Sequence, residues 1–396
     1  MKSEIGQVPF GPRPVDQSAS SGPLGFWRFE KRAKRSAREL IVIVAVVVPV
    51  IASFTAAGYA GKHDRVLQTR LSYGSTAPAV ARLTAHRTTL IGSARAGTYR
   101  LIIEPNDGLS PIYRFISSAR RSLEMTMYEL NDPHADTLLA ADAERGVDVR
   151  VILDRHYEQS ANQPAFAYLT HHRVHVRWAP SSYDLTHQKS IVVDNKEALI
   201  LTMNLTRQYY SSSRDVGVFD SNLADVRAIA DVFNHDFAGD RSSPEPSGAD
   251  LVWSPGADAR LVRLIDSARH RLFVEDEEMS EYTIVDALCA AARRGVNVEV
   301  VMTRQSSWYS NFNKLVRAGV HLRTYAPSAR IYIHAKLIDV DPGYRDGQVD
   351  IGSQNFSWAS LEYNRELGII LRNAAIEKEV AKVVAHDFAG GRPWTA

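Results

Sequence analysis

The chain of 396 residues is long enough for two ordinary domains, or for one domain built from a duplicated unit. Its formal net charge of +2 gives no general reason to expect a polyanionic partner, so such a partner would need a local basic patch. The single cysteine, Cys289, excludes an intramolecular disulfide, and its apolar neighbours predict a buried thiol rather than a nucleophile. The chain has no cluster of cysteines that would indicate a structural zinc site.

The N-terminal part of the chain predicts a targeting or anchoring segment. Residues 1–39 form a tail that ends in a basic stretch, and residues 40–61 carry no charged side chain. About 20 apolar residues span a bilayer as a helix, and a basic flank favours the cytoplasmic side. We therefore expect a transmembrane signal anchor that leaves the bulk of the chain outside the cytoplasm, attached to the membrane. The alternative is a cleaved signal peptide, because small residues precede Gly61, and the mature protein would then be secreted.

The sequence after residue 98 is a repeat. Residues 62–98 show no clear period and are interpreted as a linker. Beyond them, "PIYRFISSARRSLEMTMYEL" matches "ARLVRLIDSARHRLFVEDEEM", and Gly146 and Gly295 lie 149 residues apart within a second matching pair of segments. A match over more than one element indicates a duplicated domain. We place the copies at residues 99–245 and 246–396, on either side of a segment rich in proline and serine.

Each copy predicts the same order of elements. In the first copy, a helical spacing of apolar residues, a strand-like alternation, a second helix and a second strand follow one another over residues 112–119, 122–130, 134–146 and 147–153. The second copy repeats this order over residues 261–268, 271–278, 283–295 and 296–302. Alternating helices and apolar strands predict an α/β fold whose sheets are covered on both faces.

Both copies contain a histidine, a lysine and an aspartate at positions i, i+2 and i+7. These residues are His187, Lys189 and Asp194 in "HQKSIVVD", and His334, Lys336 and Asp341 in "HAKLIDVD". In a strand, residues i and i+2 lie on one face, so each histidine and its lysine are expected to point toward one site. Because the two motifs are in register with the duplication, they indicate function far more strongly than a single occurrence would.

An asparagine and an acid follow each motif at a fixed spacing of 11 residues. The pairs are Asn204 with Asp215, and Asn355 with Glu366. In the second copy the asparagine belongs to "GSQN", which includes Ser353, whereas the first copy has "LTMN" at this place.

This pattern resembles the phospholipase D superfamily, whose signature is a duplicated His-x-Lys-x(4)-Asp motif, a Gly-Ser-x-Asn segment and a later acidic residue. The resemblance covers roughly residues 101–391. The first copy departs from it at Leu201 and Thr202, in place of Gly-Ser, and at Asp215, in place of glutamate. The resemblance implies two tandem α/β/α repeats packed about a pseudo-twofold axis and preceded by the N-terminal apolar helix. Both halves of the site would then lie in one chain, so a monomer is expected.

The resemblance also implies a covalent mechanism. One histidine attacks phosphorus to give a phosphohistidine, and the other protonates the leaving alcohol and then activates water or a second alcohol. By analogy with the family, His187 is the nucleophile and His334 the general acid and base. No metal or other cofactor is expected, because two lysines can supply positive charge to the phosphate.

The remaining motif residues have supporting roles in this prediction. Phosphate binding is assigned to Asn204, Ser353 and Asn355, and orientation of the two histidine rings to Asp215 and Glu366. Asp194 and Asp341 belong to the catalytic motif, where bonding to backbone is a simpler role for them than proton transfer.

An acidic run, "VEDEEMSE" at residues 274–281, invites a metal-binding interpretation. Acids at the end of a strand are commonly solvated, so we expect an exposed loop edge here. Its alternative role is to bind a cationic head group, for which Glu277 is the residue to test.

The resemblance leaves three activities on phosphodiesters open. A phospholipase D that hydrolyses a phospholipid head-group ester to phosphatidic acid is our first expectation, because the N-terminal segment would hold or export the enzyme near lipid. A cardiolipin synthase-like phosphatidyltransferase is the alternative, ranked second because such enzymes usually carry two membrane helices. A metal-independent exported nuclease is third, because the near-neutral chain shows no clear basic stripe, so no obligatory nucleic-acid partner is expected.

Overall fold

The computed structural model of the chain describes residues 95–96, 99–239, 248 and 250–396. The chain divides into two compact units, Met1–Ala81 and Arg82–Ala396, and every described residue lies in the second unit. The expected tail and apolar segment, residues 1–61, therefore lie outside the described residues. Within the described part, no helix is long and apolar enough to cross a bilayer.

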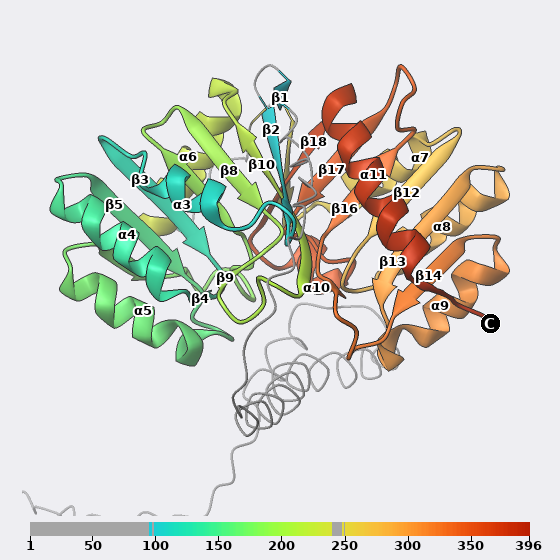
Figure 1. Cartoon of the computed structure of the whole chain (residues 1–396), viewed down its shortest axis with the longest axis horizontal. Coiled ribbons are helices and arrows are strands. Elements are labelled where there is room, and N and C mark those ends of the chain that lie inside the picture. Colours follow the sequence, from blue (N-terminus) through green and yellow to red (C-terminus); the bar gives the residue numbers. More distant parts are fainter. Residues whose placement is uncertain (1–94, 97–98, 240–247, 249) are drawn as a thin grey trace, which may run out of the picture. The chain divides into compact units, whose positions relative to one another are not determined.

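Two mixed β-sheets, one from each copy of the repeat, form the centre of this unit (Figure 1). The first sheet has the order β1 (Arg95–Ala96), β2 (Tyr99–Glu104), β10 (Ser213–Asp220), β8 (Glu197–Leu201), β7 (Ser190–Val193), β3 (Ser122–Met127), β5 (Asp148–Leu153) and β6 (His175–Trp178). The second has the order β11 (Leu251–Ser254), β18 (Glu366–Leu371), β17 (Gln348–Gly352), β16 (Leu337–Val340), β12 (Arg271–Glu275), β13 (Asn297–Thr303), β14 (His321–Tyr325) and β19 (Arg392–Pro393).

The two sheets have the same topology once the outer strands β1 and β19 are set aside. In each sheet three neighbouring strands are parallel, β3-β5-β6 and β12-β13-β14, and the other neighbours are antiparallel. The duplication in sequence is thus a duplication of topology, which confirms the predicted α/β repeats.

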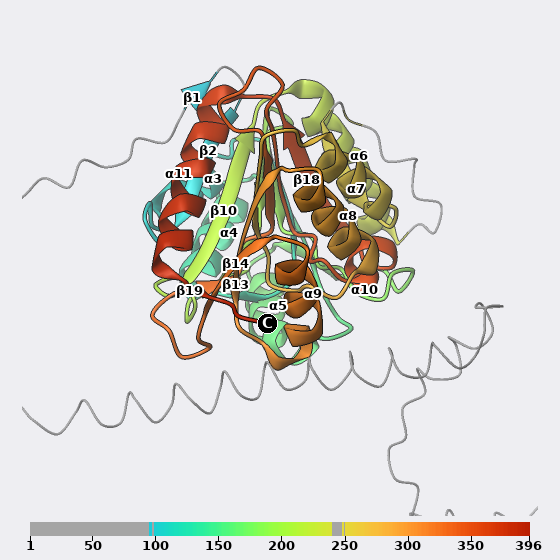
Figure 2. The ribbon, with the colours of Figure 1, turned by 90° about the vertical axis from the view of Figure 1, so that its right-hand side faces the viewer.

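Helices cover the sheets on both sides. They are α3 (Ser110–Ile116), α4 (Pro133–Glu144), α5 (Gln159–His171) and α6 (Leu223–Ala238) in the first copy, and α7 (Asp258–Ser267), α8 (Tyr282–Arg293), α9 (Tyr309–Arg317), α10 (Trp358–Glu362) and α11 (Ala374–Gly390) in the second. Figure 2 shows α11 on one side of the strands and α6, α7 and α8 on the other. Short elements complete the described part: β4 (Leu130–Asn131), β9 (Leu205–Thr206), β15 (Tyr332–Ile333) and the 3-10 helix η1 (Ser306–Trp308).

The second helix of each copy begins and ends as the sequence predicts. Asp132 caps α4 by accepting from the backbone N–H of His134, and Glu281 caps α8 by accepting from that of Thr283. After both helices the chain turns at a glycine with positive φ, +87° at Gly146 and +89° at Gly295. Other residues adopt this backbone conformation only at a cost, so these glycines stop the helices and direct the chain into β5 and β13.

One hydrophobic core joins the two copies. It contains Ile200 and Val218 of the first sheet and Ile351 and Leu367 of the second, all with 0% exposure. Two further cores each lie within one copy. Because burial of one such side chain contributes about 1.5–3 kcal/mol, the shared core makes the two copies one folded body rather than two linked domains.

The backbone before each His-x-Lys motif pairs with the opposite copy. Strand β15, just ahead of the second motif, pairs in parallel with β10 of the first sheet, and Thr186 forms a parallel bridge with Arg365. The backbone N–H of His334 donates to the carbonyl of Arg214 at 3.1 Å, and that of His187 donates to the carbonyl of Arg365 at 3.0 Å. The backbone of each histidine is therefore held by the backbone of the other copy.

Two buried ion pairs reinforce this exchange. The guanidinium of Arg214 donates two hydrogen bonds to Asp387 on α11, and that of Arg365 donates two to Asp236 on α6. No more than 5% of any of these four side chains is exposed. Planar guanidinium and carboxylate groups match in this arrangement, and breaking such a buried pair typically costs about 3–5 kcal/mol.

Candidate active site

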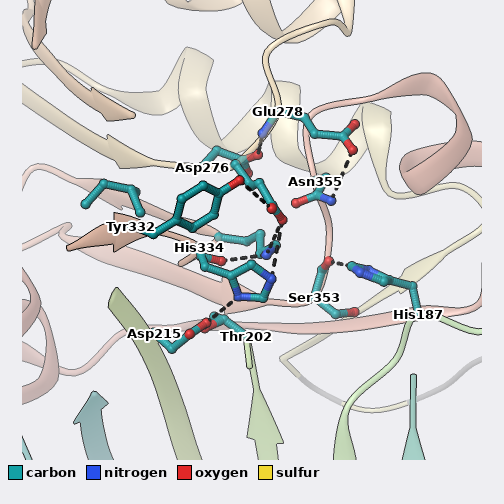
Figure 3. Close-up of polar contacts among 12 residues, drawn as sticks. His187, Thr202, Asp215, Asp276, Glu278, Tyr332, His334, Ser353 and Asn355 are labelled. Atoms are coloured by element: carbon teal, nitrogen blue, oxygen red, sulfur yellow. Dashed lines mark hydrogen bonds and ion pairs between the residues drawn. The ribbon is translucent and has the colours of Figure 1, made fainter. Parts of the chain in front are cut away.

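Each motif histidine binds a carboxylate that comes from the opposite copy. His187 Nδ1 lies 2.9 Å from Glu366 Oε2. His334 Nδ1 lies 2.7 Å from Asp215 Oδ1 (Figure 3). A ring that donates from Nδ1 to a carboxylate has a fixed tautomer and keeps Nε2 for chemistry. The sequence predicted these two acids as partners of the rings, but it did not predict that the copies exchange them.

The two acids are themselves held by hydroxyl and amide donors. Glu366 is fully buried, and its Oε1 accepts from Ser360 Oγ at 2.7 Å and from Asn364 Nδ2 at 3.2 Å. Burial alone would raise the pKa of Glu366, but the charge and hydrogen bond of His187 lower it below its ordinary value. The carboxylate is thus ionised at neutral pH and can orient the ring.

Thr202 and Ser353 have the same structural role in the two copies. The hydroxyl of Thr202 accepts from the backbone N–H of Val216 at 2.9 Å, and that of Ser353 accepts from Leu367 at 3.1 Å. The hydroxyl of Ser353 thus bonds to β18, and its carbonyl accepts from His187 Nδ1 at 3.1 Å (Figure 3). Phosphate binding by Ser353 stays a prediction. Threonine in place of serine at the departure from the family pattern preserves the bonding hydroxyl.

The two motif lysines are buried beside their histidines. Lys189 is 0% and Lys336 2% exposed, and each ammonium donates to the backbone carbonyl of the histidine two residues earlier. Both motifs lie just before β7 and β16 rather than inside the strands, yet lysine and histidine still share one site. Burial lowers the pKa of Lys189 to about 7. The Glu366 carboxylate opposes this shift, whereas the charge of Lys336 favours it.

His187 is buried and favoured in its neutral form. It is 8% exposed, and the ring of Tyr128 packs edge-on against it at 4.6 Å. Burial lowers the pKa of His187, Glu366 opposes the change, and the charges of Lys189 and Lys336 add to it. Because Lys336 belongs to the second copy, the groups of both copies act on one another and form a single site.

Glu277 enters this site, contrary to the prediction of an exposed acidic edge. Its Oε2 lies 3.1 Å from Lys336 Nζ and 3.4 Å from His334 Nε2, and its Oε1 accepts from the hydroxyl of Tyr332 at 2.8 Å. Burial alone would raise the pKa of Glu277, but the charges of Lys336 and His334 and the Tyr332 hydrogen bond lower it to about 2. Glu275 and Asp276 of the same run are also buried, with 0% exposure.

The two asparagines are placed differently from each other. Asn355 is 7% exposed, and its Nδ2 lies 3.5 Å from Glu278 Oε1, as Figure 3 shows. Asn204 lies half-buried between β8 and β9, and its Oδ1 has no hydrogen-bond partner among the described residues. Phosphate binding by either amide stays a prediction.

The motif aspartates lie at the far ends of their strands. Asp194 accepts from the backbone N–H groups of Arg120, Arg121 and Ser122, at 3.0, 2.7 and 3.1 Å. Asp341 accepts in the same way from residues 269–271. Both aspartates therefore bond to backbone, and their place among the catalytic residues stays a prediction.

The left-handed backbone at these aspartates supports a structural role. The φ angle is +55° at Asp194 and +49° at Asp341, a region in which aspartate and asparagine are the most tolerated residues after glycine. Their carboxylates then fix the starts of β3 and β12. At the other end of these strands, the chain delivers Tyr128 and Glu277 to the site.

The structure also brings together residues that the sequence analysis did not select. These are Tyr128, Tyr332, Thr202, and the ion-paired arginines and aspartates Arg214, Arg365, Asp236 and Asp387. The two arginines are 151 residues apart, and so are the two aspartates. Each aspartate lies in a copy of "HDFAG", at 235–239 and at 386–390. The repeat offset could therefore have revealed them. Among the described residues, no group of three or more His, Cys, Asp or Glu is arranged to hold a metal ion.

Comparisons with known proteins agree with the fold and the motifs. Residues 112–237 and 261–388 each match the family described as "Cardiolipin synthase, PLD-like domain". Cardiolipin synthase A of Klebsiella pneumoniae is 24% identical over 351 residues, covering 74% of this chain and 69% of that protein.

Two solved structures share the fold. Phosphatidylserine synthase of Haemophilus influenzae has a TM-score of 0.56 at 13% identity, covering 76% of this chain and 89% of that one. Polyphosphate kinase of Porphyromonas gingivalis has a TM-score of 0.57 at 14% identity, covering 73% of this chain and 50% of that one. Since the family match extends over more than half of the chain, the chain belongs to this PLD-like domain family, within the phospholipase D superfamily.

Replacing Asp194 should lower stability. Asp194→Ala removes three backbone hydrogen bonds and leaves alanine at positive φ, so the free energy of unfolding should fall by about 1–3 kcal/mol, measured by urea denaturation. Asp194→Asn, which tolerates this φ, should lose less. Asp286→Ala, at an exposed surface ion pair, is the control and should change stability by less than about 1 kcal/mol.

The same bonds predict a pH dependence. Burial would raise the pKa of Asp194, but its backbone hydrogen bonds lower it, so the stabilisation is present at neutral pH. It is lost as the pH falls below about 4, through the lowered pKa. The stability difference between wild type and Asp194→Ala should therefore shrink in acid, and a constant difference down to pH 2 would contradict this role.

Replacing Glu366 should impair the reaction rather than the fold. Glu366→Gln keeps a similar shape but removes the charge that holds His187 Nδ1–H, so kcat should fall by about 10²-fold or more. Asp215→Asn should act similarly on His334. The matched control Glu144→Gln removes the same charge from an exposed position of α4 and should keep full activity. A loss below threefold in both site variants, with unfolding midpoints unchanged, would contradict the exchanged pairs.

Proposed function

We propose that the chain is a phosphatidyltransferase of the cardiolipin synthase type. It would move a phosphatidyl group from a phospholipid to an alcohol through a phosphohistidine. The observation that carries the proposal is the pair of histidines, each braced at Nδ1 by a carboxylate of the opposite copy, beside two buried lysines. The sequence relatives named as cardiolipin synthases support an alcohol as acceptor. Hydrolysis to phosphatidic acid, ranked first from the sequence, is the second candidate and differs only in using water.

The two histidines would take different roles because their surroundings differ. His334 has a carboxylate near each ring nitrogen, Asp215 at Nδ1 and Glu277 at Nε2. A neutral imidazole has only one donor, whereas the imidazolium has two and can bond to both acids. His187 has a lowered pKa and one carboxylate partner, which favours a neutral ring with a nucleophilic Nε2. This difference supports His187 as nucleophile and His334 as general acid.

The reaction would then proceed in two balanced displacements. His187 Nε2 forms a bond to phosphorus as the bond to the head-group oxygen breaks, and His334 gives that oxygen its proton. The neutral His334 next takes the proton of an incoming alcohol, whose oxygen attacks phosphorus. The bond from phosphorus to His187 breaks, and both histidines return to their starting states. Lys189 and Lys336 would balance the negative charge on the phosphoryl oxygens throughout.

The location of the reaction is part of the proposal. A phospholipid substrate places the enzyme at a membrane, and residues 40–61, which the sequence predicts as an anchor or signal, would bring it there. The catalytic part would lie outside the cytoplasm and act as a monomer, since one chain supplies both motifs.

A product assay tests the proposed function. The full-length chain is incubated in EDTA with mixed micelles of phosphatidylethanolamine and phosphatidylglycerol, and in parallel with supercoiled plasmid DNA. Cardiolipin formation that is lost in His187→Ala and His334→Ala supports the transferase. Phosphatidic acid as the main product supports hydrolysis instead, and nicked DNA without lipid turnover supports a nuclease. Activity that survives both substitutions, or that EDTA abolishes, contradicts the mechanism.

The pKa of Lys189 predicts the alkaline limb of the pH profile. Since burial lowers this pKa to about 7, the lysine loses its charge, and with it phosphate binding, as the pH rises above that value. We expect kcat/KM, which reports the free enzyme, to fall above about pH 7. Lys189→Arg keeps its charge at all these pH values. In this variant kcat/KM should be lower, but its fall should begin at a higher pH. An unchanged limb in this variant would assign it to another group.

A further inference from the structure

The two halves of the site differ at one equivalent position. Tyr128 and Glu277 are 149 residues apart, the offset of the repeat, and each follows the strand that leads into the site. Tyr128 packs on His187 and lies 4.9 Å from the Lys189 ammonium. Glu277 takes the corresponding place beside His334 and Lys336. A neutral aromatic ring in one half thus corresponds to a negative charge in the other.

The Glu277 carboxylate adds a negative charge to those of Asp215 and Glu366 around the two histidines, at the position where the first copy has Tyr128. A phosphodiester brings one further negative charge among these largely buried groups. Unpaired charge in such surroundings is costly, so a substrate that also carries a positive charge is favoured.

The position of Glu277 indicates where that positive charge would lie. Its Oε2 lies 3.4 Å from His334 Nε2, the atom that protonates the leaving oxygen in the proposed function. An ammonium two carbons from this oxygen falls within reach of the carboxylate. A phosphate that binds Lys336 would share this ammonium with Glu277, which lies 3.1 Å away, and a head-group ammonium would give Glu277 a second cationic partner. The Glu277 side chain is 20% exposed, against 2% for Lys336, so an incoming group can reach it.

We propose that Glu277 determines specificity by binding the ammonium of an amino-alcohol head group, so that the enzyme takes a zwitterionic phospholipid as phosphatidyl donor. The inference rests on the proposed function, because it assumes that a lipid phosphodiester binds between the two histidines. A glutamate that served only to hold Lys336 in place would stabilise that lysine without discriminating between head groups.

A competition assay tests this inference. The full-length chain receives equimolar phosphatidylethanolamine and phosphatidylglycerol in mixed micelles, and released ethanolamine and glycerol are measured together. Wild type should release mainly ethanolamine. Glu277→Gln removes the charge at nearly constant shape, so the ratio of ethanolamine to glycerol should fall by about tenfold or more. An unchanged ratio in this variant would overturn the inference, as would a wild type that prefers phosphatidylglycerol.

Two matched variants separate charge from other effects. Glu277→Asp keeps the charge and should retain the preference for ethanolamine, even at a lower rate. Glu144→Gln removes a charge from an exposed helix position and should leave both rate and ratio unchanged. If the ratio falls equally in Glu144→Gln, the overall charge of the protein explains the effect and the inference is wrong.

A binding measurement keeps the inference testable if Glu277→Gln has no turnover. Phosphoethanolamine and glycerol 3-phosphate, two soluble head-group esters, are compared by the shift in melting temperature that each produces. Wild type should be stabilised more by phosphoethanolamine, and Glu277→Gln should lose this difference. Equal shifts in wild type would contradict the inference. Failure of the proposed function is distinguishable, because it appears as wild-type protein that turns over neither lipid.

Discussion

The reciprocal exchange of carboxylates between the two copies is the interaction on which the site depends. Glu366 holds His187, and Asp215 holds His334, so neither copy contains a complete histidine–acid pair by itself. The residue before each acid makes the same exchange, because Arg214 and Arg365 bind aspartates on helices of the opposite copy. The backbone ahead of each motif also pairs with the opposite copy. Folding the two copies against each other and building the active site are therefore one event.

The two sheets have the same strand order, but the two histidines have different neighbours. The strand orders agree between the sheets, yet Tyr128 lies beside one histidine and Glu277 beside the other. A symmetric site would give both histidines the same tendency to attack phosphorus. The added carboxylate gives His334 an acid near each ring nitrogen, while burial favours a neutral His187. The difference between Tyr128 and Glu277 thus accounts for the different roles proposed for the two histidines and for the proposed choice of head group.

The repeat offset made much of this predictable. It gave the α/β order of elements, the two His-x-Lys motifs and the later acids, because equivalent positions recur at 147 to 151 residues. It could not give the exchange, since an offset identifies equivalent residues without saying which copy supplies the partner. The acidic run looked solvated because residues 275–277 end a strand, and only the folded chain shows them turned inward. Asp194 shared a motif with His187, but its partners in the structure are the backbone N–H groups of residues 120–122.

In the proposed mechanism His187 forms the covalent bond to phosphorus, and His334 promotes its release, within one site built from both copies. This mechanism is tested most directly with the full-length His334→Ala variant and a phosphatidyl p-nitrophenyl ester, whose leaving group needs no general acid. We expect a burst of one nitrophenol per chain, followed by arrest, with the phosphatidyl adduct mapped to His187 by mass spectrometry. An adduct on another residue, or continued turnover without any adduct, would contradict it.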